Sequence, residues 1–129
     1  MKAMRLPAPG AALTLTELAR QEPAGHELRL RVEACGVCRT DLHLLDGELP
    51  DIRCPITPGH EIVGIVNAVG AEVTGLRVGD RVGVPWLAGT CGACRYCLEG
   101  RENLCGQARF TGYSRDGGYA EEALAEIRI

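Results

Sequence analysis

The sequence predicts a small, mainly β domain, organised as a partly open β-barrel with short helices and a cysteine-rich loop. Three observations predict this fold class. Apolar and polar residues alternate with a period of two in the clearest segments, as they do in half-buried strands. The 17 glycines and 7 prolines divide the chain at short intervals, which is typical of short strands joined by turns. Aromatic residues make up only 4% of the chain, so the interior must be built from aliphatic side chains.

The clearest predicted strand runs from residue 26 to residue 34. Leu28, Leu30, Val32 and Ala34 alternate there with charged residues. This pattern predicts a strand with one buried face, and a buried face fixes the register of the pairing.

A second strand is predicted at residues 61–69, where the sequence is β-branched and more uniformly apolar. Such a composition favours a central position in a sheet. Gly64 interrupts the run in the way that a bulge or a sharply curved strand requires. After several turn glycines, further extended segments are predicted at 81–86 and 117–129.

Only one helix is predicted, from Thr40 to about Leu45. Thr40 is a residue type that caps helix N-termini, and Gly47 is placed to end the helix. The remaining segments favour strands and turns, and for this reason the fold class is mainly β.

Length and charge exclude several functions. A chain of 129 residues fits one domain with a real core. The formal charge of -3 leaves no cationic excess, so we expect no nucleic-acid partner. No apolar run approaches the length that crosses a bilayer, and we expect no membrane association. The first 20 residues lack the apolar core of a secretion signal, so the expected location is the cytoplasm.

Residues 88–108 contain four cysteines with the spacing Cys-x2-Cys-x2-Cys-x7-Cys, namely Cys91, Cys94, Cys97 and Cys105. Two-residue spacers let a turn direct neighbouring sulfurs at one point, and four thiolates form a closed, structural zinc site. The alternative is a pair of disulfides, as in small secreted domains. The odd total of seven cysteines and the absence of a secretion signal favour zinc.

A second group consists of Cys38 and the pair His60-Glu61. A mixed set of cysteine and histidine ligands with an open position is typical of zinc that takes part in chemistry. Asp41 could orient His60 by accepting its free ring N–H. Spacing alone leaves the ordinary alternative open, in which Cys38 is a buried thiol and His60 is simply hydrogen-bonded. Likewise Asp41 could be no more than an acid in the first turn of the helix, matching its dipole.

Several segments, in this order, strongly resemble the catalytic domain of zinc-dependent medium-chain alcohol dehydrogenases. They are Cys-Gly-Val-Cys-Arg-Thr-Asp-Leu-His at 35–43, Pro-Gly-His-Glu at 58–61, Val-Gly-Asp-Arg-Val at 78–82, and the four-cysteine loop. The resemblance covers nearly the whole chain and implies a GroES-like barrel. The segments 85–91 and 110–113 look closest to bacterial members that act on small primary alcohols.

The resemblance implies a role for each matching residue. Cys38 and His60 would be ligands of a catalytic zinc, with Glu61 as an alternate ligand, and the four-cysteine loop would hold a structural zinc. Thr40 would take the proton from the substrate hydroxyl, and His43 would pass it toward solvent through the cofactor ribose.

Three further matches concern the cofactor and the substrate. Arg39 stands where the family contacts the cofactor pyrophosphate. Trp86 and Leu49 match positions that line the substrate pocket, and Trp86 would narrow it. The implied reaction is oxidation of a small primary alcohol to an aldehyde, with zinc favouring loss of the hydroxyl proton and hydride passing to NAD(P).

The sequence has no Gly-x-Gly-x-x-Gly and no βαβ pattern, so we expect the Rossmann dinucleotide-binding domain to be absent from residues 1–129. The family's third catalytic zinc ligand has no counterpart either. Residues 123–129 alternate like a strand and then stop, which predicts that the chain is part of a longer protein. We therefore expect this chain alone to be inactive, and the parent to be a homo-oligomer.

Two other function classes remain open on sequence grounds. One is a non-enzymatic zinc-binding module, and the other is a GroES-like co-chaperone that shares the barrel type. The four-cysteine loop and the pair Cys38 and His60 argue against the co-chaperone, which has no need of metal ligands.

Overall fold

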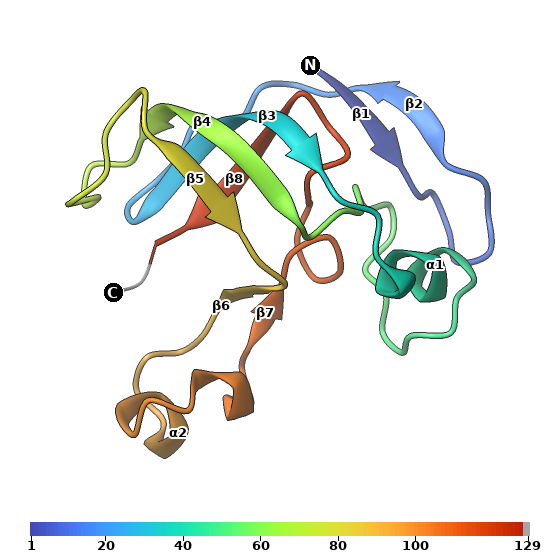
Figure 1. Cartoon of the computed structure of the whole chain (residues 1–129). Coiled ribbons are helices and arrows are strands. Elements are labelled where there is room, and N and C mark those ends of the chain that lie inside the picture. Colours follow the sequence, from blue (N-terminus) through green and yellow to red (C-terminus); the bar gives the residue numbers. More distant parts are fainter. Residues whose placement is uncertain (128–129) are drawn as a thin grey trace.

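The computed structural model describes residues 1–127 and confirms a mainly β domain (Figure 1). The strands are β1 (Lys2–Arg5), β2 (Thr14–Glu17), β3 (Glu27–Cys35), β4 (Ile62–Val69), β5 (Arg81–Val84), β6 (Leu87–Gly89), β7 (Arg109–Phe110) and β8 (Glu122–Glu126). The helical elements are α1 (Arg39–Leu45), α2 (Arg95–Leu98) and a 3-10 turn, Glu102–Leu104. An antiparallel sheet of order β5-β4-β3-β8 forms the centre, with β1-β2 and β6-β7 as separate pairs.

Strand β3 forms where the alternation predicts it, and Leu28 and Leu30 lie in the core. The prediction that the polar residues of this strand are exposed is wrong at Arg29, which is only 8% exposed. The chain before β3 covers it, and its guanidinium donates to Glu22 at 2.8 Å and to Asn67 at 2.9 Å. A charged side chain can be buried in this way because its donors are paired.

Strand β4 is central, as predicted, and a bulge occurs next to Gly64, but on the partner strand β3. Val32 pairs with Gly64 and Ala34 pairs with Val63, so β3 has one extra residue between them. A Cβ on Gly64 would lie 2.5 Å from the Arg31 carbonyl oxygen. The extra residue shifts the alternation, and Ala34, predicted to be apolar and buried, is exposed.

Helix α1 begins one residue before the predicted start, and the predicted cap is wrong. The N-cap is Cys38, not Thr40. Asp41 in the first turn reaches back, and its Oδ2 accepts a hydrogen bond from the Cys38 N–H at 2.9 Å. The helix ends as predicted, because Gly47 follows it with φ of 74°.

The core has two parts, both aliphatic, as the shortage of aromatics predicts. The larger cluster is formed by the sheet and contains Leu28, Leu30, Ile62, Val66, Val84, Ala123 and Ala125. The smaller cluster contains Leu6, Leu44 and Ile56, and α1 packs on it through Leu44. The connection from β3 to α1 and the segment from Ile56 to Ile62 both run from one cluster to the other. These two segments carry Cys38 and His60.

The pairs β1-β2 and β6-β7 and the short helix α2 were not predicted. The cysteine loop with α2 projects from the barrel on β6 and β7 (Figure 1). Of the predicted extended segment 117–129, only Glu122–Glu126 is a strand, and residues 128 and 129 lie outside the described part. No helix in residues 1–127 is long and apolar enough to cross a membrane.

Candidate metal centres

The cysteine loop is closed at its base by β6 and β7, where Leu87 pairs with Phe110 and Gly89 with Arg109. Cys91 and Cys94 precede α2, Cys97 lies within it, and Cys105 follows the 3-10 turn. The loop therefore folds back on itself and brings all four sulfurs within 4.8 Å of one another.

The sulfur spacing fits zinc and does not fit disulfides. The Sγ atoms of Cys91 and Cys97 lie 3.9 Å apart, and those of Cys94 and Cys97 lie 3.5 Å apart. Four sulfurs placed tetrahedrally at about 2.3 Å from a zinc ion would be about 3.8 Å from each other. A disulfide needs about 2.05 Å, and all seven cysteines are free thiols. The loop is a four-cysteine cluster able to bind a metal.

Backbone amides donate to two of these sulfurs and favour the thiolate form, which a metal requires, at Cys91. The N–H groups of Ala93 and Cys94 point to Cys91 Sγ at 3.5 and 3.3 Å, and the Gln107 N–H points to Cys105 Sγ at 3.4 Å. These amide donors, that of Ala93 first, lower the pKa of Cys91 to about 6. Hydrogen bonds to the charged form account for the direction.

The second group of potential ligands lies on the two segments that connect the core clusters. One ligand atom each from Cys38, His60 and Glu61 lies within 4.8 Å of the others. Thr40, His60, Glu61, Pro85 and Trp86 line an open cavity of about 480 Å³ at this point. The structure thus brings together residues from the start of α1, the start of β4 and the end of β5.

Asp41 connects the two segments that carry the ligands. It is 3% exposed, and its Oδ1 lies 3.4 Å from His60 Nδ1 and 3.3 Å from the Gly59 N–H. Its Oδ2 accepts the Cys38 N–H. With Nδ1 directed at Asp41, Nε2 is the ring nitrogen that remains available to a metal, the arrangement usual for ligating histidines.

Thr40 and Glu61 border the same ligand group. The Cys38 thiol lies 3.8 Å from the Thr40 hydroxyl oxygen. The exposed Glu61 carboxylate folds over Gly36, where a Cβ would collide with its Oε2. The glycine therefore gives Glu61 room to approach Cys38 and His60, and this donor set of thiol, imidazole and carboxylate suits zinc.

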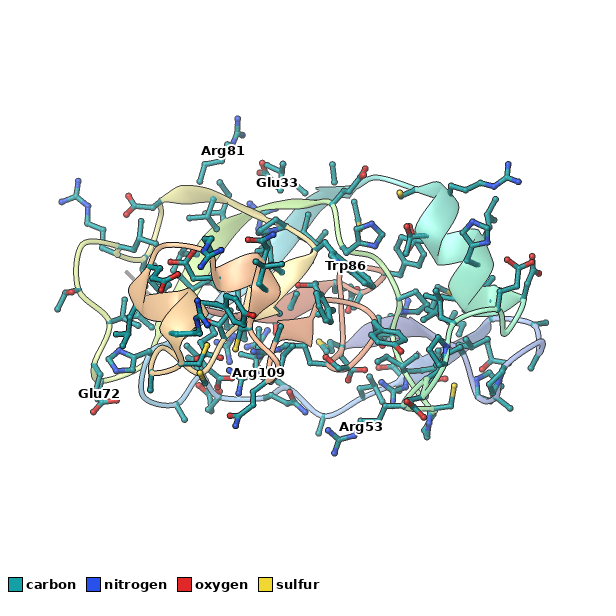
Figure 2. All side chains as sticks on the ribbon, turned by 90° about the horizontal axis from the view of Figure 1, so that it is seen from below. Glu33, Arg53, Glu72, Arg81, Trp86 and Arg109 are labelled. Atoms are coloured by element: carbon teal, nitrogen blue, oxygen red, sulfur yellow. The ribbon has the colours of Figure 1, made fainter. Side chains whose placement is uncertain are left out.

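Three aromatic rings pack together next to His60. Trp86 meets the His60 ring edge to face at a centroid distance of 4.9 Å. Phe110 stacks on Trp86 at 4.9 Å, and Tyr113 lies 5.8 Å from it. Figure 2 shows Trp86 near the centre of the face seen from below, with Arg53 and Arg81 at the periphery. The packing of Phe110 and Tyr113 on Trp86 has no signal in the spacing of the sequence.

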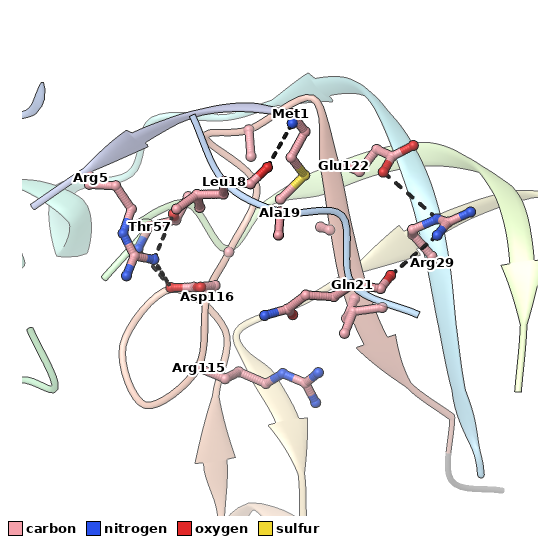
Figure 3. Close-up of a pocket in the computed structure, with 14 residues that line it drawn as sticks. Met1, Arg5, Leu18, Ala19, Gln21, Arg29, Thr57, Arg115, Asp116 and Glu122 are labelled. Atoms are coloured by element: carbon pink, nitrogen blue, oxygen red, sulfur yellow. Dashed lines mark hydrogen bonds and ion pairs between the residues drawn. The ribbon is translucent and has the colours of Figure 1, made fainter. Parts of the chain in front are cut away.

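A separate cavity of about 290 Å³ lies under the N-terminal segment (Figure 3). It shares no lining residue with the cavity at His60. Its arginines are neutralised locally: Arg5 pairs with Asp116 at 2.6 Å and Arg29 lies 3.7 Å from Glu122. Arg115 pairs with Glu27 at 3.0 Å. The cavity offers no free charge to a ligand, and the metal centres are the stronger candidates.

The family model described as the alcohol dehydrogenase GroES-like domain matches residues 24–128. The chain belongs to this family. An alcohol dehydrogenase from Geobacillus stearothermophilus is 49% identical over 114 residues, which cover 88% of this chain and 34% of the relative. This alcohol dehydrogenase GroES-like domain therefore spans about a third of the length of the curated relatives it matches.

Solved structures show the same domain as part of larger proteins. A thermostable alcohol dehydrogenase from Pyrobaculum aerophilum, with cobalt and zinc bound, matches with a TM-score of 0.89 and 34% identity, over 98% of this chain and 38% of that one. A protein of Sinorhizobium meliloti classed as a zinc-binding dehydrogenase, bound to NADP, matches with a TM-score of 0.88 and 42% identity, over 97% and 36%. The remaining two thirds of these proteins have no counterpart in this sequence.

The other residues expected to act in this GroES-like domain do not line the cavity at His60. Arg39 is exposed at the start of α1 and makes no ion pair with any residue from 1 to 127. His43 on α1 is partly exposed and pairs with Glu48. Leu49 does not border the cavity at His60 and instead packs on the smaller core cluster.

Proposed function

We propose that this chain is the zinc-carrying catalytic domain of an enzyme that oxidises a small primary alcohol to an aldehyde with NAD(P). The observation that carries the proposal is the convergence of Cys38, His60 and Glu61 on a cavity that also contains Thr40 and Trp86. Family membership supports the reaction class. The substrate and the choice between NAD and NADP are part of the proposal, because this chain spans only about a third of the length of its relatives.

The residues divide the chemistry between them. A zinc ion held by Cys38, His60 and Glu61 would stabilise negative charge on the substrate oxygen. Thr40 lies next to Cys38 and would accept the hydroxyl proton, and His43 on the next turn of α1 would pass it to solvent. Asp41 holds His60 in the tautomer that leaves Nε2 for the metal.

Other side chains would bind the cofactor or limit the size of the substrate. Arg39, exposed and free of ion pairs within residues 1–127, would contact the cofactor pyrophosphate, which a guanidinium can bind through two hydrogen bonds. Trp86 would limit the size of the alcohol, since it is fixed by His60 on one side and Phe110 on the other. Leu49 packs on the smaller core cluster, so it would reach the substrate only after a shift of the loop that follows α1.

The cofactor half is a required partner in this proposal. Residues 1–129 contain no glycine-rich dinucleotide motif, so the isolated chain should oxidise no alcohol. We also propose that the whole protein is homo-oligomeric and that the four-cysteine loop carries a structural zinc. Leu98 and Leu104 on that loop are 74% and 49% exposed, as expected for a surface covered in a larger assembly.

The test is to join this chain to the remaining two thirds of the Geobacillus stearothermophilus alcohol dehydrogenase and to follow alcohol-dependent reduction of NAD or NADP. We expect turnover with small primary alcohols, at least a hundredfold loss for Cys38→Ser, and no loss for Cys54→Ser. Equal turnover of the fusion and its Cys38→Ser variant would contradict the proposed function.

A further inference from the structure

The hydroxyl group of Tyr119 is an exception to the rule that buried polar groups are hydrogen-bonded. Its oxygen is shielded from solvent and makes no hydrogen bond of ordinary geometry, and it is the one such side-chain atom among residues 1–127. A buried hydroxyl without a partner costs stability. Phenylalanine would fill the same space without this cost, so the hydroxyl calls for an explanation.

The backbone fixes the ring of Tyr119 against the residue that precedes His60. The Tyr119 N–H donates to the Pro58 carbonyl at 3.0 Å, and the Gly118 N–H donates to the Gly59 carbonyl at 2.9 Å. A Cβ on Gly59 would lie 2.7 Å from the Tyr119 ring, and Gly59 has φ of 97°. Gly59 is thus required both for its conformation and for close contact with the ring.

The hydroxyl of Tyr119 faces the acidic side of the metal group. Burial raises its pKa, and the negative charge and acceptor oxygens of Asp41, with smaller contributions from Cys35 and Cys38, raise the pKa further. The phenol is therefore neutral at physiological pH and can act only as a hydrogen-bond donor toward a carboxylate. Asp41 is the carboxylate among these neighbours.

Asp41 has room for one more donor. A carboxylate offers about four lone-pair sites. Three donors already approach it: the N–H of Cys38 at 2.9 Å, the N–H of Gly59 at 3.3 Å, and Nδ1 of His60 at 3.4 Å. The last two are long for hydrogen bonds, so the carboxylate is incompletely held on the side that faces His60.

We propose that Tyr119 is a positioning residue whose hydroxyl donates the fourth hydrogen bond to Asp41 when the Cys38 and His60 site holds its metal. The inference rests on the proposed metal site and names a residue that supports it. Tyr119 acts through Asp41 on His60: it fixes the carboxylate, and the carboxylate fixes the imidazole.

The experiment compares the two metal sites within one molecule. Zinc affinity is measured by competition with chelators for the wild type, Tyr119→Phe, Asp41→Asn and the double variant. Partners behind a ligating histidine typically change metal affinity about 10- to 100-fold. Because Tyr119 lies one contact farther away, we expect Tyr119→Phe to weaken the Cys38 and His60 site about three- to tenfold and to leave the four-cysteine site unchanged.

The double variant separates positioning from packing. In the Asp41→Asn background, Tyr119→Phe should have a smaller effect than in the wild type, because the amide offers the hydroxyl only one, uncharged, acceptor oxygen. Tyr113→Phe, which removes the hydroxyl bonded to the Pro50 carbonyl, is the matched control and should leave both affinities unchanged. Metal-free Tyr119→Phe should be at least as stable to urea as the wild type, since it loses an unpaired hydroxyl.

Three outcomes decide the matter. An unchanged affinity in Tyr119→Phe overturns the inference while leaving the proposed function intact. A loss of affinity that is as large in the Asp41→Asn background as in the wild type also overturns it and assigns Tyr119 to packing. If the wild type binds zinc only at the four-cysteine loop, the proposed function fails first, and the inference fails with it.

Discussion

Asp41 performs two tasks at once. The sequence predicted that it orients His60, and the structure places its Oδ1 3.4 Å from His60 Nδ1. Its other oxygen caps α1 at Cys38, a task that the sequence assigned to Thr40. The cap was misassigned because Thr40 has the right chemistry for it, whereas the fold turns Asp41 back toward the loop. One carboxylate therefore bonds to the helix start and lies against the histidine.

Replacing Asp41 by alanine should destabilise the metal-free domain by about 1–3 kcal/mol, because the buried N–H groups of Cys38 and Gly59 lose their acceptor. The free energy of unfolding in urea measures this. Asp46→Ala, at an exposed position at the other end of α1, should change stability by less than about 0.5 kcal/mol. Equal effects of the two substitutions would show that Asp41 does not hold these segments.

The depressed pKa of Cys91 predicts a change in the pH dependence of metal binding. Above its pKa of about 6, Cys91 is already a thiolate, so zinc displaces no proton from it. Below that pH one more proton must leave, and the logarithm of the affinity should fall more steeply by about one unit per pH unit.

Zinc competition in the Cys38→Ser variant isolates the four-cysteine loop and can be followed from about pH 5 to about pH 8. A break in slope near pH 6 is the expected result. A constant slope across this range would mean that the amides of Ala93 and Cys94 do not stabilise the thiolate.

At the scale of elements, prediction succeeded where a local pattern determines the structure. Strands β3 and β4 follow from alternation and apolar composition, and Gly64 marks the place of a bulge, although the extra residue lies on β3. The pairs β1-β2 and β6-β7 were missed because strands of two to four residues are stabilised by distant partners rather than by their own pattern. Arg29 was misplaced because its cover comes from another segment of the chain.

Gly64→Ala should destabilise the domain by about 1–3 kcal/mol, since the added Cβ would meet the Arg31 carbonyl and the Leu30 side chain in the tightly packed sheet. Gly83→Ala on β5 is the matched control, because its Cβ would meet nothing closer than 3.8 Å. Urea unfolding of the pair tests the bulge. Similar stabilities would show that the sheet has room at Gly64.

At the scale of the whole molecule, the site depends on segments that only the fold brings together. The ligand types and the cysteine spacing could be predicted from the sequence, because zinc chemistry restricts both. The contacts of His60 with Trp86 and the approach of Tyr119 to Asp41 could not, because each joins residues far apart in the chain. The fold puts the metal group on segments that connect the two core clusters and leaves the cysteine loop outside both clusters.

Because the loop contributes no residue to the two aliphatic clusters, losing its metal should disorder the loop and leave the barrel folded. Cys97→Ser should become sensitive to proteolysis within residues 92–104 while the far-ultraviolet circular dichroism spectrum stays β-rich. Leu98→Ala, an exposed change in the same helix, serves as control and should resist cleavage. Global unfolding of Cys97→Ser would contradict this division.

The central claim is that one chain seats two zinc ions in different ways, one enclosed by four sulfurs and one held by Cys38, His60 and Glu61 beside an open cavity. Metal analysis of the purified chain measures this most directly. We expect two zinc ions per wild-type chain, and one each in Cys38→Ser and Cys97→Ser. One zinc in the wild type, unchanged in Cys38→Ser, would contradict the claim.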